Sequence, residues 1–142
     1  MGLITLLRNV LGFPKPEGED SAAHDGLILH PPPKVEIYGP RGIRQFIRSI
    51  FTLTHSRSAD KYAVHELLLS GEQPSVPITG TDAEPMHSSE VPGKDIRCDA
   101  DGFWRGIAEE KMGQGYSYCS VIVDAGPIVH RGEIAPVFVM GK

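Results

Sequence analysis

The 142-residue sequence predicts a fold of the α/β (α+β) class, and three patterns along the chain predict it. An N-terminal stretch repeats apolar residues with helical spacing, a strand-like stretch near residue 35 changes into a second helical pattern, and the last third contains β-branched stretches. A strand followed by a helix is typical of layered α/β folds. The apolar fraction of 40% predicts a globular chain with a core, and we expect one domain over residues 1–142.

The first predicted element is an N-terminal helix with one apolar face. Its apolar residues follow the i, i+3, i+4, i+7 spacing and are Leu3, Leu6, Leu7, Val10 and Leu11. Gly12 and Pro14 are expected to end this helix. Residues 14–33 are rich in proline, glycine and acidic side chains, so they predict a long loop.

A strand and then an amphipathic helix are predicted for residues 34–51. Residues 34–38 alternate polar and apolar side chains, which indicates a half-buried strand. After a Gly-Pro turn the period becomes helical, and the inner apolar stripe consists of Ile43, Phe46, Ile47, Ile50 and Phe51. Arg44 and Arg48 lie one turn apart, and we expect them on the exposed side of this helix with Arg41.

The middle of the chain contains one ambiguous element and one long loop. Residues 61–69 are apolar enough for either a strand or a buried helix, because their periodicity favours neither. Residues 70–94 are rich in proline, glycine and serine without a period, so they predict a long surface loop.

The C-terminal third predicts strands separated by turns. Asp99 to Gly102 reads as a turn before the apolar residues 103–107. Residues 117–124 are rich in β-branched side chains and predict a buried strand. Gly126 and Pro127 predict the next turn, and residues 137–140 predict a final short strand.

The charge balance limits the contacts with nucleic acid that the chain can make. A net charge of −4 argues against a protein that coats nucleic acid generally, so any RNA contact must come from a local basic patch. Arg41, Arg44 and Arg48 are the candidates, because guanidinium groups match phosphate oxygens. A solvated helix face is the commoner explanation for such a pattern.

The two cysteines and the N-terminus predict an intracellular protein. Cys98 and Cys119 form neither a disulfide framework nor a zinc motif, and we expect both to be free thiols in a reducing compartment. The apolar run at the N-terminus has no basic lead-in and breaks at Arg8, so it does not match a signal peptide. The nucleus, the cytoplasm and the mitochondrion all fit this expectation.

Six histidines are present, and none lies in a compact metal-binding motif such as H-x-H or H-E-x-x-H. His130 is the best candidate for a functional residue, because it follows a predicted strand and turn, where sites of layered folds gather. His65 is the second candidate, and we interpret it as structural. No catalytic residue is identified from these patterns.

Four segments resemble the tRNase Z (ribonuclease Z) branch of the metallo-β-lactamase superfamily. Residues 1–3 and the helix after them resemble the stretch that follows the family's H-x-H-x-D-H motif. Residues 37–51 match its Y-G-P-x-G-[LI] strand and helix, and residues 62–67 resemble the next strand, which often ends in H-E-L. Residues 125–131 resemble the A-x-P-[LI]-x-H segment, whose histidine is a zinc ligand. The comparison also favours a strand over a helix at residues 62–67.

The resemblance implies a metallo-β-lactamase αββα sandwich that cleaves precursor tRNA after the discriminator base and removes the 3′ trailer. Two zinc ions would supply the hydroxide and clamp the phosphodiester oxygens. Of this chain's residues, His130 alone carries over as a metal ligand. The H-x-H-x-D-H motif, the bridging aspartate and the final zinc histidine are not among the 142 residues.

One imidazole cannot hold a dinuclear site, because each zinc takes about four ligands. We therefore expect an incomplete metallo-β-lactamase-like domain that is inactive as a nuclease by itself. The alternatives are a non-catalytic remnant of the fold that binds RNA or a partner subunit, and another hydrolase of the superfamily, such as an arylsulfatase- or lactonase-like one. Strand edges left unpaired in a partial fold predict self-association.

Overall fold

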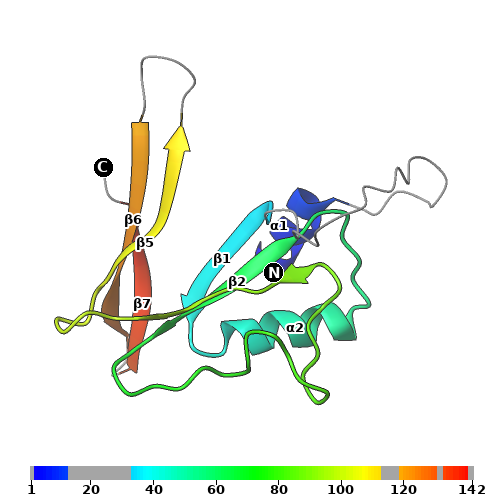
Figure 1. Cartoon of the computed structure of the whole chain (residues 1–142), viewed down its shortest axis with the longest axis horizontal. Helices are drawn as coiled ribbons and strands as arrows, with labels where there is room; N and C mark the ends of the chain where they lie inside the picture. The colour runs from blue at the N-terminus through cyan, green and yellow to red at the C-terminus, as the bar shows by residue number, and fades with distance from the viewer. Residues whose placement is uncertain (1, 13–32, 113–118, 131–132, 141–142) are drawn as a thin grey trace, which may run out of the picture.

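A computed structural model describes residues 2–12, 33–112, 119–130 and 133–140 of the chain (Figure 1). In chain order the elements are α1 (Gly2–Leu11), β1 (Val35–Pro40), α2 (Ile43–Leu53), β2 (Tyr62–Leu68), β3 (Glu90–Val91), β4 (Asp95–Arg97), β5 (Trp104–Met112), β6 (Cys119–His130) and β7 (Glu133–Met140). This mixture confirms the α/β class. Neither of these two helices has the length and apolarity that a membrane-crossing segment needs.

The first sheet, sheet A, is parallel and is built around β2. On one side β1 pairs with β2 from Val35 opposite Tyr62 onward. On the other side two short strands follow one another along β2, with Glu90 of β3 opposite Tyr62 and Asp95 of β4 opposite Glu66. In the described part of the chain β1 forms one edge of this sheet and the short strands β3 and β4 form the other, and self-association through such an edge stays a prediction.

The ambiguous residues 61–69 form the central strand of sheet A, as the resemblance favoured. All seven residues of β2 are buried. A strand covered on both faces has no polar side and therefore shows no alternation, which is why its periodicity could not distinguish it from a helix.

The second sheet, sheet B, is an antiparallel arrangement of β5, β6 and β7. The predicted turn at Gly126-Pro127 is wrong, because β6 continues through both residues to His130. Gly126 has a packing role instead: a Cβ atom there would lie 2.8 Å from the ring of Phe103. Pro127 lies opposite Pro136 of β7, and the chain reverses between His130 and Glu133, which pair in register.

Two cores lie on opposite faces of sheet A. The helices cover one face with a cluster formed by Leu7, Leu11, Ile37, Ile47, Phe51, Tyr62 and Val64. Leu67, which points to the other face of β2, packs with Trp104, Ile107 and Ala125 of sheet B. The indole Nε1 of Trp104 donates to the carbonyls of Leu68 (3.1 Å) and Ile96 (3.2 Å). Figure 1 accordingly places sheet B at the end of sheet A to which β1 and β2 point.

The buried side of α2 differs from the predicted inner stripe. Ile47 and Phe51 are buried as expected, whereas Phe46 is 47% exposed. The other buried residues of α2 are Arg44 and Arg48. The helix is therefore rotated so that two basic side chains, and not Phe46, face the sheet.

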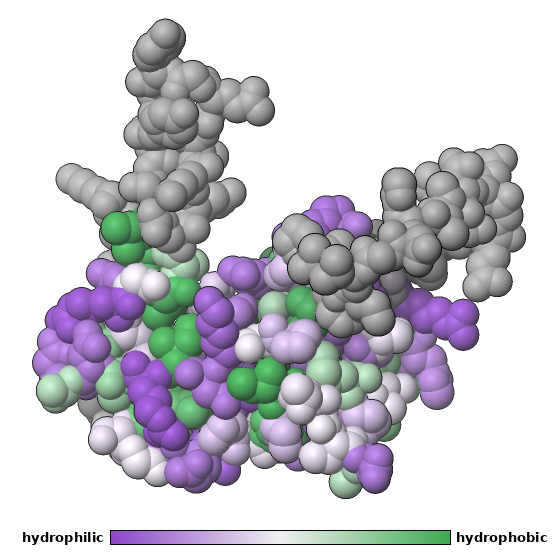
Figure 2. All heavy atoms as spheres, in the orientation of Figure 1, coloured by the Kyte–Doolittle hydropathy of each residue, from purple (hydrophilic) through white to green (hydrophobic). Residues whose placement is uncertain are grey.

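The predicted loops have different outcomes. Residues 70–94 contain β3 and the buried Val76, so part of this segment belongs to the core. Most of residues 14–33 lie outside the described part of the chain, and the loop predicted there stays a prediction. On the face shown in Figure 2, apolar side chains form small groups among polar ones and no single continuous patch.

Candidate functional site

A buried carboxylate joins the turn before α2 to the centre of sheet A. Gly42 precedes the helix with φ 101°, a conformation that favours glycine. Glu66 of β2 is fully buried, and its Oε1 accepts hydrogen bonds from the backbone N–H groups of Gly42 (2.9 Å) and Arg44 (3.3 Å). A carboxylate at this place satisfies free N–H groups and complements the helix dipole. Glu66 thus caps α2 from a distant strand.

The charge of Glu66 is held by several donors. Ser75 donates to it through both its hydroxyl and its backbone N–H, the latter at 2.8 Å. Burial by itself raises the pKa of Glu66, but the hydrogen bonds from Ser75, Gly42 and Arg44 outweigh burial and lower the pKa below its usual value. The residue is therefore ionised at neutral pH and ties residues 70–94 to the helix.

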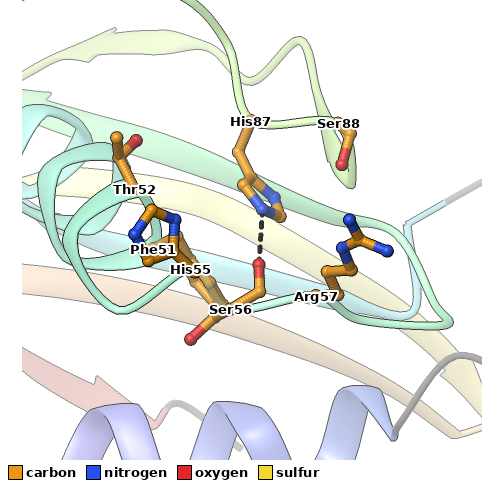
Figure 3. Close-up of a pocket in the computed structure, with 7 residues that line it drawn as sticks. All are labelled: Phe51, Thr52, His55, Ser56, Arg57, His87 and Ser88. Carbon is orange, nitrogen blue, oxygen red and sulfur yellow. Dashed lines mark hydrogen bonds between the residues drawn. The ribbon is translucent and has the colours of Figure 1, made fainter.

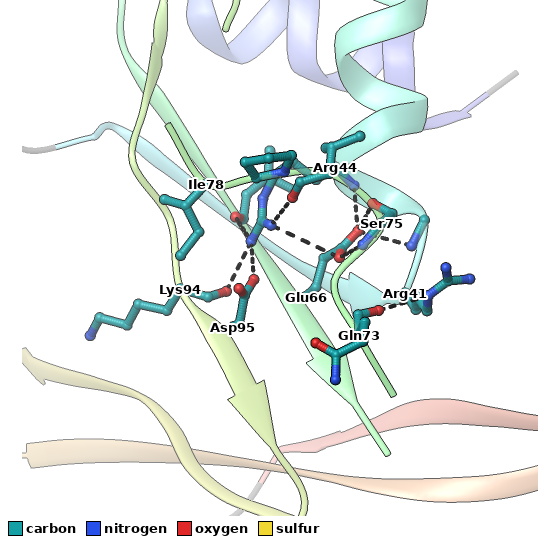
Figure 4. A network of polar contacts seen from close by, with 12 residues as sticks. Arg41, Arg44, Glu66, Gln73, Ser75, Ile78, Lys94 and Asp95 are labelled. Atoms are coloured by element: carbon teal, nitrogen blue, oxygen red, sulfur yellow. Dashed lines mark hydrogen bonds and ion pairs between the residues drawn. The ribbon is translucent and has the colours of Figure 1, made fainter. Parts of the chain in front are cut away.

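Arg44 is buried beside this carboxylate and is enclosed by oxygen atoms (Figure 4). One of its guanidinium nitrogens donates to Asp95 Oδ1 at 2.6 Å, and the other donates to the Val76 carbonyl at 3.0 Å. The guanidinium also lies 3.9 Å from Glu66 Oε2. A charge removed from water requires such compensation, which two carboxylates and the carbonyls of Val64, Val76 and Lys94 supply here.

Arg48, one turn along α2, has a similar environment. It is 1% exposed and binds both oxygens of Glu90, through Nε at 2.8 Å and NH2 at 2.8 Å. Its guanidinium also donates to the carbonyls of Pro77 (2.9 Å) and Ile78 (2.8 Å). The planar guanidinium group suits this bidentate arrangement, so Arg48 clamps the loop of residues 77–78 to the helix.

The expectation of an exposed arginine face is therefore wrong for Arg44 and Arg48. Both guanidinium groups are covered, and their terminal nitrogens already bind carboxylates and carbonyls. Arg41 is exposed, and its Nε donates to the Gln73 carbonyl at 2.7 Å. RNA contact by Arg41 stays a prediction. RNA contact by Arg44 and Arg48 would require exposed guanidinium groups, and theirs are buried.

His65 lies within the packing of sheet A. Its ring is 3% exposed and is stacked on Tyr38 at 4.4 Å between ring centroids, with an angle of 11°. Neither ring nitrogen has a hydrogen-bond partner among the described residues, and Nε2 lies 3.9 Å from Glu36 Oε1. Burial lowers the pKa of His65 against the opposing effect of Glu36, so a neutral imidazole is favoured.

His130 is the last residue of β6, and it was predicted to lie at the end of a strand. Its side chain lies outside what the structure describes, so its role as a zinc ligand stays a prediction. In the described ranges no three His, Cys, Asp or Glu side chains are grouped so that they could hold a metal ion. These residues do not fit a dinuclear zinc site.

A pocket lies where α2 ends and meets residues 87–88 (Figure 3). Its volume is about 270 Å³, and its lining consists of Phe51, Thr52, His55, Ser56, Arg57, His87 and Ser88. The inner wall is fixed, because His87 Nε2 lies 2.8 Å from the Ser56 carbonyl while its Nδ1 accepts from the Ser89 N–H at 3.2 Å. Those two contacts place the ring proton on Nε2.

Sequence reasoning missed the acidic partners and the pocket. Two arginines four residues apart could have indicated buried pairs, since each lies beside an apolar residue of the inner stripe. Glu66 within an apolar strand was a second signal, because an ionised residue buried in a sheet requires a partner. No sequence signal brings residues 55–57 beside residues 87–88.

No protein-family model matches this sequence, and no curated protein matches it. A solved structure with a similar chain path is that of human tRNase Z, short form (ELAC1). The two sequences are 24% identical, and the match covers 80% of this chain and 34% of that chain with a TM-score of 0.49. A likeness of this level assigns neither a family nor an activity.

Proposed function

We propose that this chain is part of a tRNase Z-like, zinc-dependent endoribonuclease of the metallo-β-lactamase superfamily, which removes the 3′ trailer from precursor tRNA. We further propose that these 142 residues do not cleave RNA by themselves. The chain spans about a third of the length of the solved structure that it resembles. The activity and the substrate of the whole protein are therefore part of this proposal.

The observation that carries the proposal is the contact between two of the resembling segments. Tyr38, from the Y-G-P-x-G stretch, stacks on His65 from the H-E-L stretch. In the same two segments the Glu66 carboxylate accepts from the Gly42 N–H at 2.9 Å. The turn with positive φ and the buried glutamate therefore depend on each other. A physically coupled pair of motifs supports a shared fold better than two unconnected matches.

The chain's own residues supply a scaffold in this proposal. Glu66 fixes the start of α2, and Arg48 fixes the loop of residues 77–78 against the helix. Zinc, when bound in a complete site, would activate water and clamp phosphodiester oxygens. His130 is the single residue of this chain proposed to contribute a ligand, and each zinc takes about four.

A cleavage assay with the full chain tests the second half of the proposal. Precursor tRNA with a labelled 3′ trailer would be incubated with the chain and zinc, while bound metal is measured by atomic absorption. We expect no trailer release and less than one tightly bound zinc per chain. Turnover that a chelator abolishes would contradict this expectation.

The family assignment is tested in the transcript. In-frame codons for H-x-H-x-D-H directly upstream of the Met1 codon would support it. An in-frame stop codon at that place, with no such motif in the transcript, would remove the zinc-dependent nuclease and leave a non-catalytic fold.

A second candidate function is a non-catalytic protein that binds RNA or a partner subunit. The side chains of Arg57 and His55, which make no hydrogen bond or ion pair with the described residues, favour this candidate because they are free to meet an external group. A gel shift with tRNA that weakens as salt increases would support it, and no shift at low salt would exclude it. Replacing Arg44 and Arg48 is unsuitable for this test, because their loss would disturb the core.

A further inference from the structure

We infer that the pocket at the end of α2 binds a phosphate group, and that in the RNA-processing role proposed above it receives a phosphate of the RNA strand. The second part of this inference rests on the proposed function. The pocket is formed by the end of α2, the turn after it and residues 87–88, with Phe51 and His87 at its base (Figure 3).

The side chains around the pocket have free hydrogen-bonding capacity. Within the described ranges, oxygen atoms of the protein bind the guanidinium groups of Arg41, Arg44, Arg48, Arg97 and Arg105. Arg57 has no such partner, although it is exposed and borders the pocket. The hydroxyl of Ser88 and the ring of His55 likewise make no hydrogen bond with the described residues. These groups present donors that the fold leaves without an acceptor.

The local charge favours an anion. Lys61 donates from Nζ to the carbonyl of Ser88 at 2.8 Å, so a second cation is bound to a residue that lines the pocket together with Arg57. The acidic residues nearest to Arg57 and Ser88 along the chain are already paired: Asp60 is bound to Lys34 at 2.6 Å, and Glu90 is bound to Arg48 at 2.8 Å. A guanidinium that lines a pocket attracts phosphate oxygens strongly, and an ammonium bound to a lining residue adds to the attraction.

Three carbonyls at the end of α2 are occupied by hydrogen bonds within the chain. The last carbonyls of a helix carry partial negative charge and would repel an anion if they remained free. Here the Ile50 carbonyl accepts from Thr54 N–H, the Phe51 carbonyl accepts from Ser56 N–H, and the Thr52 carbonyl accepts from His55 N–H. These bonds reduce the negative potential that reaches the pocket.

The pocket is also rigid and small enough for this ligand. The rings of Phe51 and His87 stack with centroids 5.0 Å apart, and Tyr62 stacks on Phe51 at 5.1 Å. His87 is held by two hydrogen bonds, so the base of the pocket is formed before a ligand enters. A cavity of about 270 Å³ is below the usual size of a drug-binding site and suits a phosphate with its attached sugar.

Figure 3 shows how the lining side chains are distributed around the pocket. Arg57 and Ser88 lie on one side of His87, whereas Thr52 and His55 lie on the other. A phosphate above the His87 ring would meet the guanidinium and the Ser88 hydroxyl first, with a ring N–H of His55 as a further donor.

The test compares two exposed arginines that have no partner among the described residues. Arg57→Ala removes the proposed ligand contact, and Arg8→Ala on α1 is the matched control. Titrations of ¹⁵N-labelled full chain with inorganic phosphate and with adenosine monophosphate would be followed by amide shifts. Binding of fluorescent precursor tRNA would be followed by anisotropy at several salt concentrations.

We expect phosphate to shift the amides of residues 55–57 and 88 in the unaltered chain and in Arg8→Ala. Arg57→Ala should weaken both phosphate and RNA binding by about tenfold, the effect of one charge-assisted contact. It should also reduce the salt slope of RNA binding by about one. Equal behaviour of the two variants, or no shift at these amides, would overturn the inference.

The phosphate pocket and the RNA role can fail separately. If inorganic phosphate shifts the pocket amides and Arg57→Ala abolishes this effect, while precursor tRNA does not bind, the pocket is established for small phosphates and its RNA assignment is overturned. If RNA binds equally well to both variants, the RNA-binding role survives and the pocket is not its site.

Discussion

Two sets of basic side chains on and just after α2 have opposite environments. Arg44 and Arg48 are buried and bind carboxylates on neighbouring strands. Arg57 and His55, only a few residues further, are exposed and make no hydrogen bond or ion pair in the part of the chain that is described. The comparison teaches that helical spacing alone does not distinguish a cation that stabilises the fold from one available to a ligand. What distinguishes the two cases is whether a strand supplies an acidic partner, as β2, β3 and β4 do with Glu66, Glu90 and Asp95.

The largest expected effect comes from breaking the buried pair of Arg48 and Glu90. Glu90→Gln leaves the guanidinium buried without its carboxylate, which typically costs about 3–5 kcal/mol of unfolding free energy. Urea denaturation would measure the loss. The double variant Arg48→Met, Glu90→Met is the control, because it removes both charges and should be the more stable of the two proteins. Equal stability of Glu90→Gln and the unaltered chain would contradict the clamp.

Removing the cap on α2 should have the next largest effect. Glu66→Gln keeps the size of the side chain but loses its charge, and hydrogen bonds to a charged group contribute about 2 kcal/mol. Far-ultraviolet circular dichroism during urea unfolding would report the loss. Glu36→Gln, on the exposed rim of β1, is a matched change at a surface position and should leave the midpoint nearly unchanged.

Acid should weaken the fold through both Glu66 and His65. Because the pKa of Glu66 is lowered by folding, its contribution is complete above the usual value of 4.5 and is lost as pH falls through the folded-state pKa. His65 is buried neutral and its pKa is also lowered, so the unfolded chain takes up protons first as pH falls below 6.5. Stability should therefore decline in two stages.

His65→Phe separates the two stages. The phenyl ring can keep the stacking with Tyr38 and cannot take up a proton, so the decline that begins below pH 6.5 should disappear while the one below pH 4.5 persists. Thermal melts at half-unit steps of pH would show this. A variant with an unchanged profile above pH 5 would show that His65 is not the titrating group.

Arg57→Ala should have almost no effect on stability, since an exposed side chain without a partner contributes little to folding. Its urea midpoint should match that of Arg105→Ala, which breaks an exposed pair with Asp99 and Asp101 that water and salt screen. A marked loss of stability in Arg57→Ala but not in Arg105→Ala would show that Arg57 stabilises the fold, as Arg44 and Arg48 do, and is not available to a ligand.

The elements with strong local patterns could be predicted from the sequence. The helix Gly2–Leu11 and the strand Val35–Pro40 lie close to their predicted places, because their patterns reflect one buried face. The exposure of Phe46 and the burial of Arg44 were not predictable, since they depend on Asp95, which lies 51 residues from Arg44 along the chain. A hydropathy pattern assigns charge to the surface and cannot detect a partner at that separation.

The same limit explains the outcome for the candidate sites. His130 does end a strand, but the prediction placed a turn at Gly126-Pro127 before it, and β6 continues through both residues. The pocket that Arg57 and Ser88 line depends on how residues 70–94 return to α2, which no local pattern indicates. Gly126 shows a further case: glycine and proline together usually predict a turn, but the ring of Phe103 requires the glycine within a continuous strand.

The indole of Trp104 gives the molecule an optical reporter. It is the sole tryptophan of the 142 residues and is 1% exposed, with its N–H held by two carbonyls of sheet A. Its emission should therefore be blue-shifted and resistant to iodide quenching for as long as the two sheets remain together. A red shift that precedes the loss of helical ellipticity would reveal that the sheets separate before α2 unwinds.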